Sequence, residues 1–595
     1  MAIPEYINEI IKIVENLPEK DNFAKLAKSD LLIRINEFLS REHGTIMKDV
    51  ISKALNTSKG INKNYYRELL LQYIAMLIRL QDYKEALRIA GNNNIDPKYV
   101  IDVAIENHGI NVLEHINEFP EKHRNYIIIR VWISEARKNN IDKALEEIMK
   151  LEDIPEKFFA LIELARIAIN RNIKEESERI IKYVEENLGR IEESYLSSIA
   201  SLCIHIKALL NAPDTLEFFE KWRTKIRNID LLNFVPELVV YLIAKNELNK
   251  AIELINSIEE KDRKDLIILN SVDNLCKKGF LNQAIRISLM ASDRIILAQA
   301  YLIIAKNYDP KEKDNILAYI RLSLEHALKW FDENMLLVQR YAEKIKEEDK
   351  NYSKMDINQI ILFHPQVSGL LRNVLSVSRR ALEDLINALI EKELLQDALH
   401  FANYVCTLRK MMCDFADKIR FRIAIKEDKM NEVTNTLRSA SGVLFSELIE
   451  ILNEMLSDKD KLREILINEL KYDASIGNIE KMQVISNILI SNDWIDDTLN
   501  ILSEISDSKI KGQIAAYIAD LLLDKNVEKA EEMANEAWRI LNELEINEGI
   551  PIANILAKVL HKLGKHDDFL EIIRKCAESK DPWSAGLILR NVFSS

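Results

Sequence analysis

Glycine and proline are scarce in this sequence of 595 residues, which contains 13 of the first and 11 of the second. Folds rich in β-strands need many tight turns, and those turns depend on glycine and proline. The two glycines nearest to each other, Gly549 and Gly564, are fifteen residues apart. Phosphate-binding loops, dinucleotide-binding turns and the serine turn of hydrolases all need glycines close together. The sequence therefore disfavours a β-rich fold and these classes of enzyme.

Cysteine is also rare, with five residues and no CxxC pair, which is typical of a reducing compartment. Cys406 and Cys413 are seven residues apart, so we expect them on one face of a helix, beyond disulfide reach. Cys203 and His205 offer two metal ligands without two more at suitable spacing. We interpret these residues as core residues and predict no metal and no cofactor.

Long apolar runs are missing, and none approaches the length of about 20 residues that a membrane helix needs. The N-terminal segment carries Glu5 and no extended apolar core, unlike a signal peptide. We therefore expect a cytoplasmic protein with no membrane contact. The net charge of −13 argues against nucleic acid as the main partner. Abundant lysine, glutamate and isoleucine, with few glutamines, is a composition typical of a thermophile.

A short phrase recurs along the chain, in which a polar turn residue precedes a small residue and then an aliphatic one. Copies lie at Ala86-Leu87, Ala144-Leu145, Ala251-Ile252, Ala284-Ile285, Ala398-Leu399 and Thr498-Leu499, with a variant at Ala530-Glu531. The small residues are 33 positions apart from Ala251 to Ala284 and 34 from Ala284 to Ala318. A period near 34 residues is typical of helical hairpins that stack on one another.

The two predicted helices of one period differ in character. Residues 158–169 are apolar almost all round, whereas residues 173–188 carry a narrow stripe of Ile180, Val184 and Leu188 beside a charged face. An apolar helix is expected between neighbours in a stack, and a one-sided helix on its outside. We predict that the small repeated residues let two helices approach closely.

These phrases, with apolar helices such as Tyr301–Ala305, resemble the tetratricopeptide-repeat superfamily over most of residues 60–345 and about 470–595. The Trp-x-x-Leu-Gly opening of that family is not evident here. We predict an all-α fold, an α-solenoid of stacked antiparallel helix pairs that forms a tetratricopeptide-like superhelix. The resemblance implies binding of a protein or peptide partner, most often on the concave face.

The phrase is absent between Ala318 and Ala398, and residues 351–369 break its rhythm. We therefore predict an interruption near 346–370 and four segments. These are an N-terminal helical cap at 1–60, a first solenoid at 61–345, an irregular central helical region at 346–465 and a second solenoid at 466–595.

The central region is locally basic in an acidic chain, with ten basic and seven acidic residues across positions 366–426. Such a patch suits an acidic partner segment or a phosphate backbone. The alternative is that its cations form i,i+4 pairs on helix surfaces, as Arg379–Glu383, Arg380–Asp384 and Lys410–Asp414 would. The candidate partner-binding patch comprises Arg372, Arg379, Arg380, Arg409, Lys410, Arg420 and Arg422.

No set of residues suggests catalysis. His561 and His566 flank Gly564 at a predicted hairpin, and we interpret them as partly exposed turn histidines. We predict a non-catalytic scaffold or adaptor that binds a protein partner through a concave superhelical surface. The alternatives are a nucleic-acid-associated helical repeat protein that uses the central basic region, and a sensor subunit of a separate NTPase or signalling complex.

Overall fold

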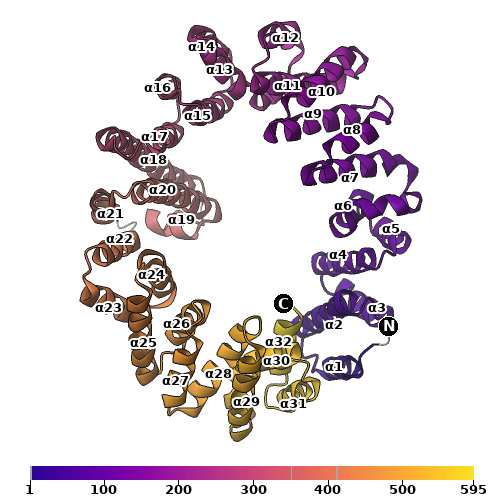
Figure 1. Cartoon of the computed structure of the whole chain (residues 1–595), viewed down its shortest axis with the longest axis vertical. Helices are drawn as coiled ribbons and strands as arrows, with labels where there is room; N and C mark the ends of the chain where they lie inside the picture. Colours follow the sequence, from indigo (N-terminus) through magenta and orange to yellow (C-terminus); the bar gives the residue numbers. More distant parts are fainter. Residues whose placement is uncertain (1–2, 350, 410–412, 595) are drawn as a thin grey trace. The chain divides into compact units, whose positions relative to one another are not determined.

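The computed structural model describes residues 3–349, 351–409 and 413–594, which form helices joined by short loops and no strand (Figure 1). The first half contains α1 (Glu5–Asn16), α2 (Asn22–Glu42), α3 (Lys48–Lys59), α4 (Lys63–Arg79), α5 (Tyr83–Asn92), α6 (Pro97–His108), η1 (Gly109–Glu118), η2 (Glu121–His123), α7 (Arg124–Lys138), α8 (Ile141–Met149), α9 (Pro155–Asn170), α10 (Lys174–Asn187), η3 (Leu188–Arg190), α11 (Glu193–Leu210), α12 (Thr215–Trp222), η4 (Arg223–Lys225), η5 (Asn228–Asn233), α13 (Val235–Ala244), α14 (Leu248–Asn256), α15 (Lys261–Lys277) and α16 (Leu281–Ser288). The second half contains α17 (Arg294–Asn307), α18 (Lys313–Glu348), α19 (Ile357–Phe363), α20 (Pro365–Glu391), α21 (Leu395–Arg409), α22 (Cys413–Lys426), α23 (Met430–Ser439), α24 (Gly442–Met455), α25 (Lys459–Ile476), α26 (Ile479–Ser491), α27 (Ile495–Glu504), α28 (Ser508–Leu522), α29 (Val527–Glu543), α30 (Ile546–Lys562), α31 (His566–Ala577) and α32 (Trp583–Phe593). None of these helices has the length and apolar character that crossing a membrane requires.

The chain divides into two compact units, one made of Met1–Ile127 with Phe421–Ser595 and the other of Ile128–Arg420. In the second unit, α9, α11, α13, α15 and α17 pack in series, and an outer helix accompanies each. In the first unit, α6, α4, α2, α32, α30, α28, α26 and α24 form such a series. The prediction of an all-α solenoid of stacked helix pairs is confirmed. The predicted boundaries at 60, 345 and 465 lie inside these units and stay predictions.

The inner helices carry apolar residues on nearly every side, as predicted, and therefore lie between neighbouring helices. Helix α9 buries residues from Phe158 to Ala168 all around its surface, whereas α10 buries mainly a stripe that includes Ile180 and Val184. A helix that is apolar all round is stable only between neighbours.

A turn with one left-handed residue joins the two helices of most pairs, and the residue five positions later is buried. The backbone amide after the left-handed residue bonds back to the inner helix, as Phe280 does to the Leu275 carbonyl at 2.9 Å. This bond closes a Schellman turn, which satisfies carbonyls at the helix end. The pairs of left-handed and buried residues are Gln81/Ala86, Asn139/Ala144, Asn172/Ser177, Asn246/Ala251, Gly279/Ala284, Glu393/Ala398, Asp493/Thr498 and Gly564/Phe569.

The predicted register fails at Ala318, which is exposed in α18 between the buried Leu317 and Ile320. No left-handed turn precedes this helix. The turn that fixes the position of the small residue in the other hairpins is therefore missing at Ala318, which was assigned by spacing alone. The seams around Ala251 and Ala284 keep the predicted register, since both side chains are fully buried.

Lysine side chains bind the carbonyls at several helix ends, and two of these lysines, Lys157 and Lys481, are buried. Lys157 is 3% exposed, and its Nζ donates to the Met149 and Leu151 carbonyls at 3.1 and 2.8 Å, where α8 ends. An ammonium group at a helix C-terminus satisfies free carbonyls and complements the helix dipole. Lysines placed in the same way beyond the ends of α1, α17, α23 and α26 are Lys28, Lys392, Lys481 and Lys525.

The predicted interruption near 346–370 is present, and it has a core of its own. Helix α18 is 36 residues long and packs against the short α19 and the 27-residue α20. A hydrophobic cluster fills the space between them. Its buried members are Val338, Ala342, Ile360, Ile361, Val367 and Val374.

Cys406 and Cys413 form a disulfide with a Cα–Cα distance of 4.9 Å, which corrects the sequence-based interpretation. The prediction assumed one continuous helix, on which residues seven apart are too distant. Instead α21 ends at Arg409 and α22 begins at Cys413, so the two cysteines belong to different helices.

Candidate functional site

The first and last helices of the sequence pack together within the first unit, in what we call the terminal junction, formed by α1, α2, α31 and α32 (Figure 1). Helix α2 contacts α32 and α1 contacts α31. Glu9 pairs with Arg574, and the Arg34 guanidinium donates to the Ser594 hydroxyl at 2.9 Å. The junction therefore repeats the packing of neighbouring hairpins between residues at opposite ends of the sequence.

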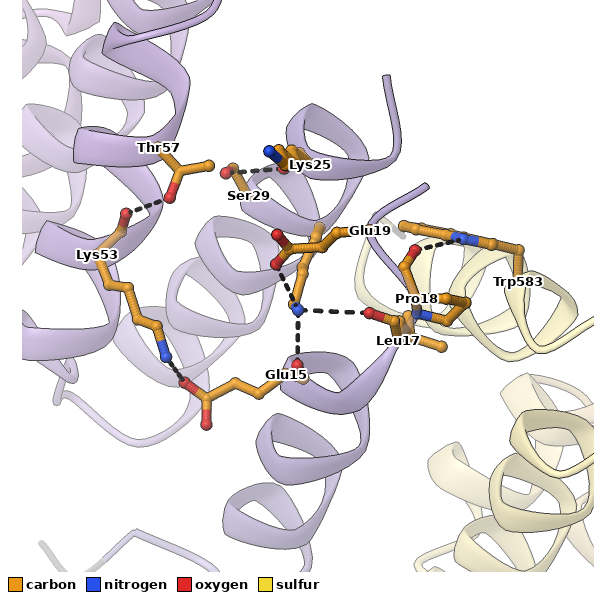
Figure 2. Close-up of polar contacts among 10 residues, drawn as sticks. Glu15, Leu17, Pro18, Glu19, Lys25, Ser29, Lys53, Thr57 and Trp583 are labelled. Atoms are coloured by element: carbon orange, nitrogen blue, oxygen red, sulfur yellow. Dashed lines mark hydrogen bonds and ion pairs between the residues drawn. The ribbon is translucent and has the colours of Figure 1, made fainter. Parts of the chain in front are cut away.

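The loop after α1 is the point at which α32 meets the N-terminal helices (Figure 2). The Lys28 ammonium donates to the Glu15 carbonyl at 2.6 Å and to the Glu19 carboxylate at 2.8 Å. The Trp583 indole N–H then donates to the Pro18 carbonyl at 3.2 Å, as Figure 2 shows. Lys28 thus binds carbonyls where α1 ends, those of Glu15 and Leu17, and Trp583 binds the next carbonyl along the chain, that of Pro18.

An apolar pocket of about 460 Å³ opens beside this contact, and we call it the junction pocket. Its size falls within the range of about 300–1,000 Å³ of typical ligand sites. Residues from α2, α4 and α32 line it. They are Phe23, Leu26, Ala27, Asp30, Leu31, Tyr65, Trp583, Gly586, Leu587 and Arg590.

Gly586 lets α32 approach the N-terminal helices. A Cβ atom at this position would lie 3.0 Å from the Trp583 ring, 3.3 Å from Leu31 and 3.4 Å from Leu17. Glycine within a helix lowers its stability by about 1 kcal/mol relative to alanine. At this position the close packing of α32 against the N-terminal helices offsets that loss.

The mouth of the pocket is rimmed by exposed apolar side chains. Phe23 is 79% exposed and Leu587 is 54% exposed. Large apolar side chains that remain exposed beside a concave site are typical of interaction surfaces. The rim is therefore suited to contact with another molecule.

A charged group is among the residues that line the pocket. Asp30 is 6% exposed, and its carboxylate accepts a hydrogen bond from the Arg34 Nε at 2.8 Å. Arg590 approaches the same carboxylate at 3.7 Å. Burial, followed by the adjacent Asp30, raises the pKa of Tyr65 to about 12, so the hydroxyl stays protonated and donates to that carboxylate. Two guanidinium groups therefore face one carboxylate, and the local charge is positive.

The terminal junction also contains a cluster of aromatic and histidine rings. Tyr6 stacks on His566 with ring centroids 4.0 Å apart, and its hydroxyl lies 3.3 Å from the His561 Nε2. Burial, followed by the neighbouring His566 and His43, lowers the pKa of His561 to about 4. His561 also contacts Phe593 edge-on. Sequence reasoning placed these histidines in a hairpin turn but offered no sign of their contact with α1.

The predicted basic patch is partly neutralised. Arg379 donates to Glu383 at 2.7 Å, as the surface-pair alternative expected, and also to Asp414 at 3.1 Å. Arg420 donates to Asp417 and Asn403, both at 2.7 Å. These carboxylates reduce the charge that these two arginines offer to a partner.

The other members of the patch differ in their surroundings. Arg372 and Arg380 are exposed on α20, and neither has a carboxylate partner among the described residues. Arg409 is the last residue of α21, and Lys410 lies outside the described residues. Arg422 is half-buried and belongs to the first unit. The patch as a binding site stays a prediction.

The candidate metal ligands Cys203 and His205 lie on α11. Cys203 is fully buried, and burial raises the pKa of its thiol. The His205 Nδ1 lies 3.2 Å from the Glu237 carboxylate. These surroundings are those of packed helix residues, in line with the sequence-based interpretation.

No protein-family model matches this chain. Over 230 residues it is 23% identical to the type VII secretion system protein EssC of Staphylococcus aureus strains NCTC 8325 and COL. That alignment covers 36% of this chain, which spans only 15% of the length of these curated relatives. A solved structure described as a "circular tandem repeat protein with novel repeat topology and enhanced subunit contact surfaces" is similar at 15% identity. It matches over 95% of this chain and 98% of its own, with a TM-score of 0.14, too low to add to the fold described above.

Proposed function

We propose that this protein is a non-catalytic scaffold of the tetratricopeptide-like type that binds a protein partner, and that the junction pocket is a docking point. The observation that carries the proposal is the combination of an apolar pocket of about 460 Å³ with the exposed Phe23 and Leu587 at its mouth. Stacked helical repeats commonly use extended surfaces to bind other proteins.

The energetic case rests on the apolar rim. Covering one large apolar side chain contributes about 1.5–3 kcal/mol, and a partner residue that enters the pocket contributes a similar amount. Protein interfaces obtain most of their affinity from a few such anchors in well-packed pockets. Phe23, Leu587 and Trp583 are three residues of this kind around one opening.

The partial similarity to a type VII secretion system protein supports a role within a larger protein assembly. It does not identify the partner, because the match covers 36% of this chain and 15% of that protein. The concave wall that the tetratricopeptide resemblance implies is a further docking surface within this proposal. The cytoplasmic location expected from composition also belongs to the proposal.

Nucleic acid is the weaker alternative, because carboxylates already hold Arg379 and Arg420 of the basic patch. The net charge of −13 also opposes a phosphate backbone.

Site-specific photo-crosslinking in the producing cells tests the proposal. A photoreactive amino acid at position 23 is expected to give a discrete protein adduct, which mass spectrometry then identifies. The matched control places it at Val443, which is 76% exposed in the same unit but does not line the pocket. Absence of an adduct at position 23, or the same adducts at both positions, would refute docking at this pocket.

A further inference from the structure

Arg590 combines exposure with unused hydrogen-bonding capacity. Its side chain is 59% exposed, and its contact with Asp30 runs through Nε at 3.7 Å. The two terminal nitrogens of the guanidinium have no hydrogen-bond partner among the described residues. A guanidinium fork of this kind binds a carboxylate through two parallel hydrogen bonds.

Asp30 does not offer a matching site for a cation. Its carboxylate already accepts from the Arg34 Nε at 2.8 Å and from the Tyr65 hydroxyl. It is 6% exposed, so an incoming ammonium group would have to displace these donors. The charge that the junction pocket presents to solvent is therefore that of Arg590.

The apolar and cationic parts of the pocket lie on one face of α32. Trp583, Leu587 and Arg590 are spaced by four and three residues, which places them one above the other along a helix. Neighbours at this spacing are about 5–6 Å apart at Cβ, so two neighbouring groups of one ligand can reach both. A ligand that fills the apolar part thus brings an adjacent group to Arg590.

We infer that the junction pocket binds an acidic protein segment in which a large apolar side chain is next to a carboxylate. The apolar side chain enters between Phe23, Leu587 and Trp583, and the carboxylate pairs with Arg590. This inference rests on the proposed function and adds the chemistry of the partner. A protein segment, rather than a small amphiphilic acid, fits the exposed Phe23, which extends the contact beyond the pocket itself.

Fluorescence anisotropy with the full chain tests the inference. The probe is a dye-labelled peptide Gly-Ser-Gly-Phe-Glu-Gly-Ser-Gly, and the matched peptides replace Glu by Gln or Phe by Ser. We expect the Glu peptide to bind about tenfold more tightly than the Gln peptide, the ratio that one charged hydrogen-bonded contact supplies. The Ser peptide is expected to lose a similar factor, because it cannot fill the apolar part.

Variants of the chain test which residue causes the preference for the Glu peptide over the Gln peptide. Arg590→Gln is expected to remove the difference between the Glu and Gln peptides, and Arg590→Lys to retain part of it. Phe23→Ser is expected to weaken both peptides equally. Arg286→Gln removes another exposed arginine, which lies on α16 without a carboxylate partner among the described residues, and is expected to change nothing.

Four outcomes would overturn the inference. They are equal binding of the Glu and Gln peptides, a preference that survives Arg590→Gln, loss of binding in Arg286→Gln instead, and tighter binding of free 3-phenylpropionate than of the peptide. The last of these would favour a small acid as the ligand. An adduct at position 23 in the crosslinking experiment would still support docking, so failure of the charge-based inference is distinguishable from failure of the proposed function.

Discussion

Replacement of Ala284 by leucine tests whether the repeated small residue is what allows α16 to approach the inner helices α15 and α17. Ala284 is fully buried on α16, which packs against both α15 and α17. Leucine adds three carbon atoms where no solvent-accessible space exists. Overpacking of this kind costs about 1–3 kcal/mol. The opening equilibrium of the hairpin should rise by about 5- to 150-fold, since 1.4 kcal/mol corresponds to a factor of ten.

Hydrogen exchange measured by mass spectrometry is the suitable assay, because repeat arrays open locally and a single global midpoint can hide the effect. Exchange should accelerate in α15, α16 and α17 and remain unchanged in α9. Ala318→Leu is the control, since sequence spacing assigned Ala318 to the same position but the structure exposes it. Exposed substitutions usually stay within about 0.5 kcal/mol. Equal effects of the two leucines, or no effect of either, would refute the reasoning.

Three further predictions concern a helix end, a turn and the terminal junction. Lys157→Met should destabilise the second unit by about 2–3 kcal/mol in urea unfolding, because buried acceptors at the end of α8 lose their donor; an unchanged midpoint would contradict this. Glu393→Gly should stabilise the chain by about 1 kcal/mol in the same assay, since Glu393 holds a φ of 59° where the equivalent Gly279 has no Cβ to strain; a loss of stability would contradict it. The pKa of His561 falls from 6.5 to about 4 on folding, so the unfolded state binds the extra proton between these values, and stability present above pH 6.5 should be lost as the pH falls towards 4. Protection factors for hydrogen exchange in α1, which correct for the intrinsic pH dependence of exchange, should fall over this range in the native chain and less in His561→Gln; equal protection at both pH values would contradict this.

The fold was predictable because local pattern determines most of a solenoid. The spacing of small residues placed Ala251 and Ala284 correctly in buried seams, and the apolar run at 158–169 became an inner helix. The same spacing failed at Ala318, where a 36-residue helix replaces a hairpin. The turn residue five positions before each small one would have detected this failure, because none precedes Ala318.

The candidate site was not predictable from the same patterns. Trp583 and Pro18 are 565 positions apart, and no periodicity relates positions at such a distance. The exposed Phe23 looks like any helix-start residue in the sequence, and only the position of α32 makes it the rim of a pocket. The basic patch illustrates the opposite error, since sequence spacing suggested Lys410 as the partner of Asp414, whereas Asp414 comes from another helix to pair with Arg379.

The terminal junction has a consequence for biosynthesis. Ribosomes add about 5–20 residues per second, so the 565 positions between Pro18 and Trp583 take roughly half a minute to two minutes to translate. For most of this interval α31 and α32 do not yet exist, so they cannot cover the apolar faces of α1 and α2. A nascent chain of this kind exposes an apolar surface on α1 and α2 to chaperones until α31 and α32 have been synthesised and cover it.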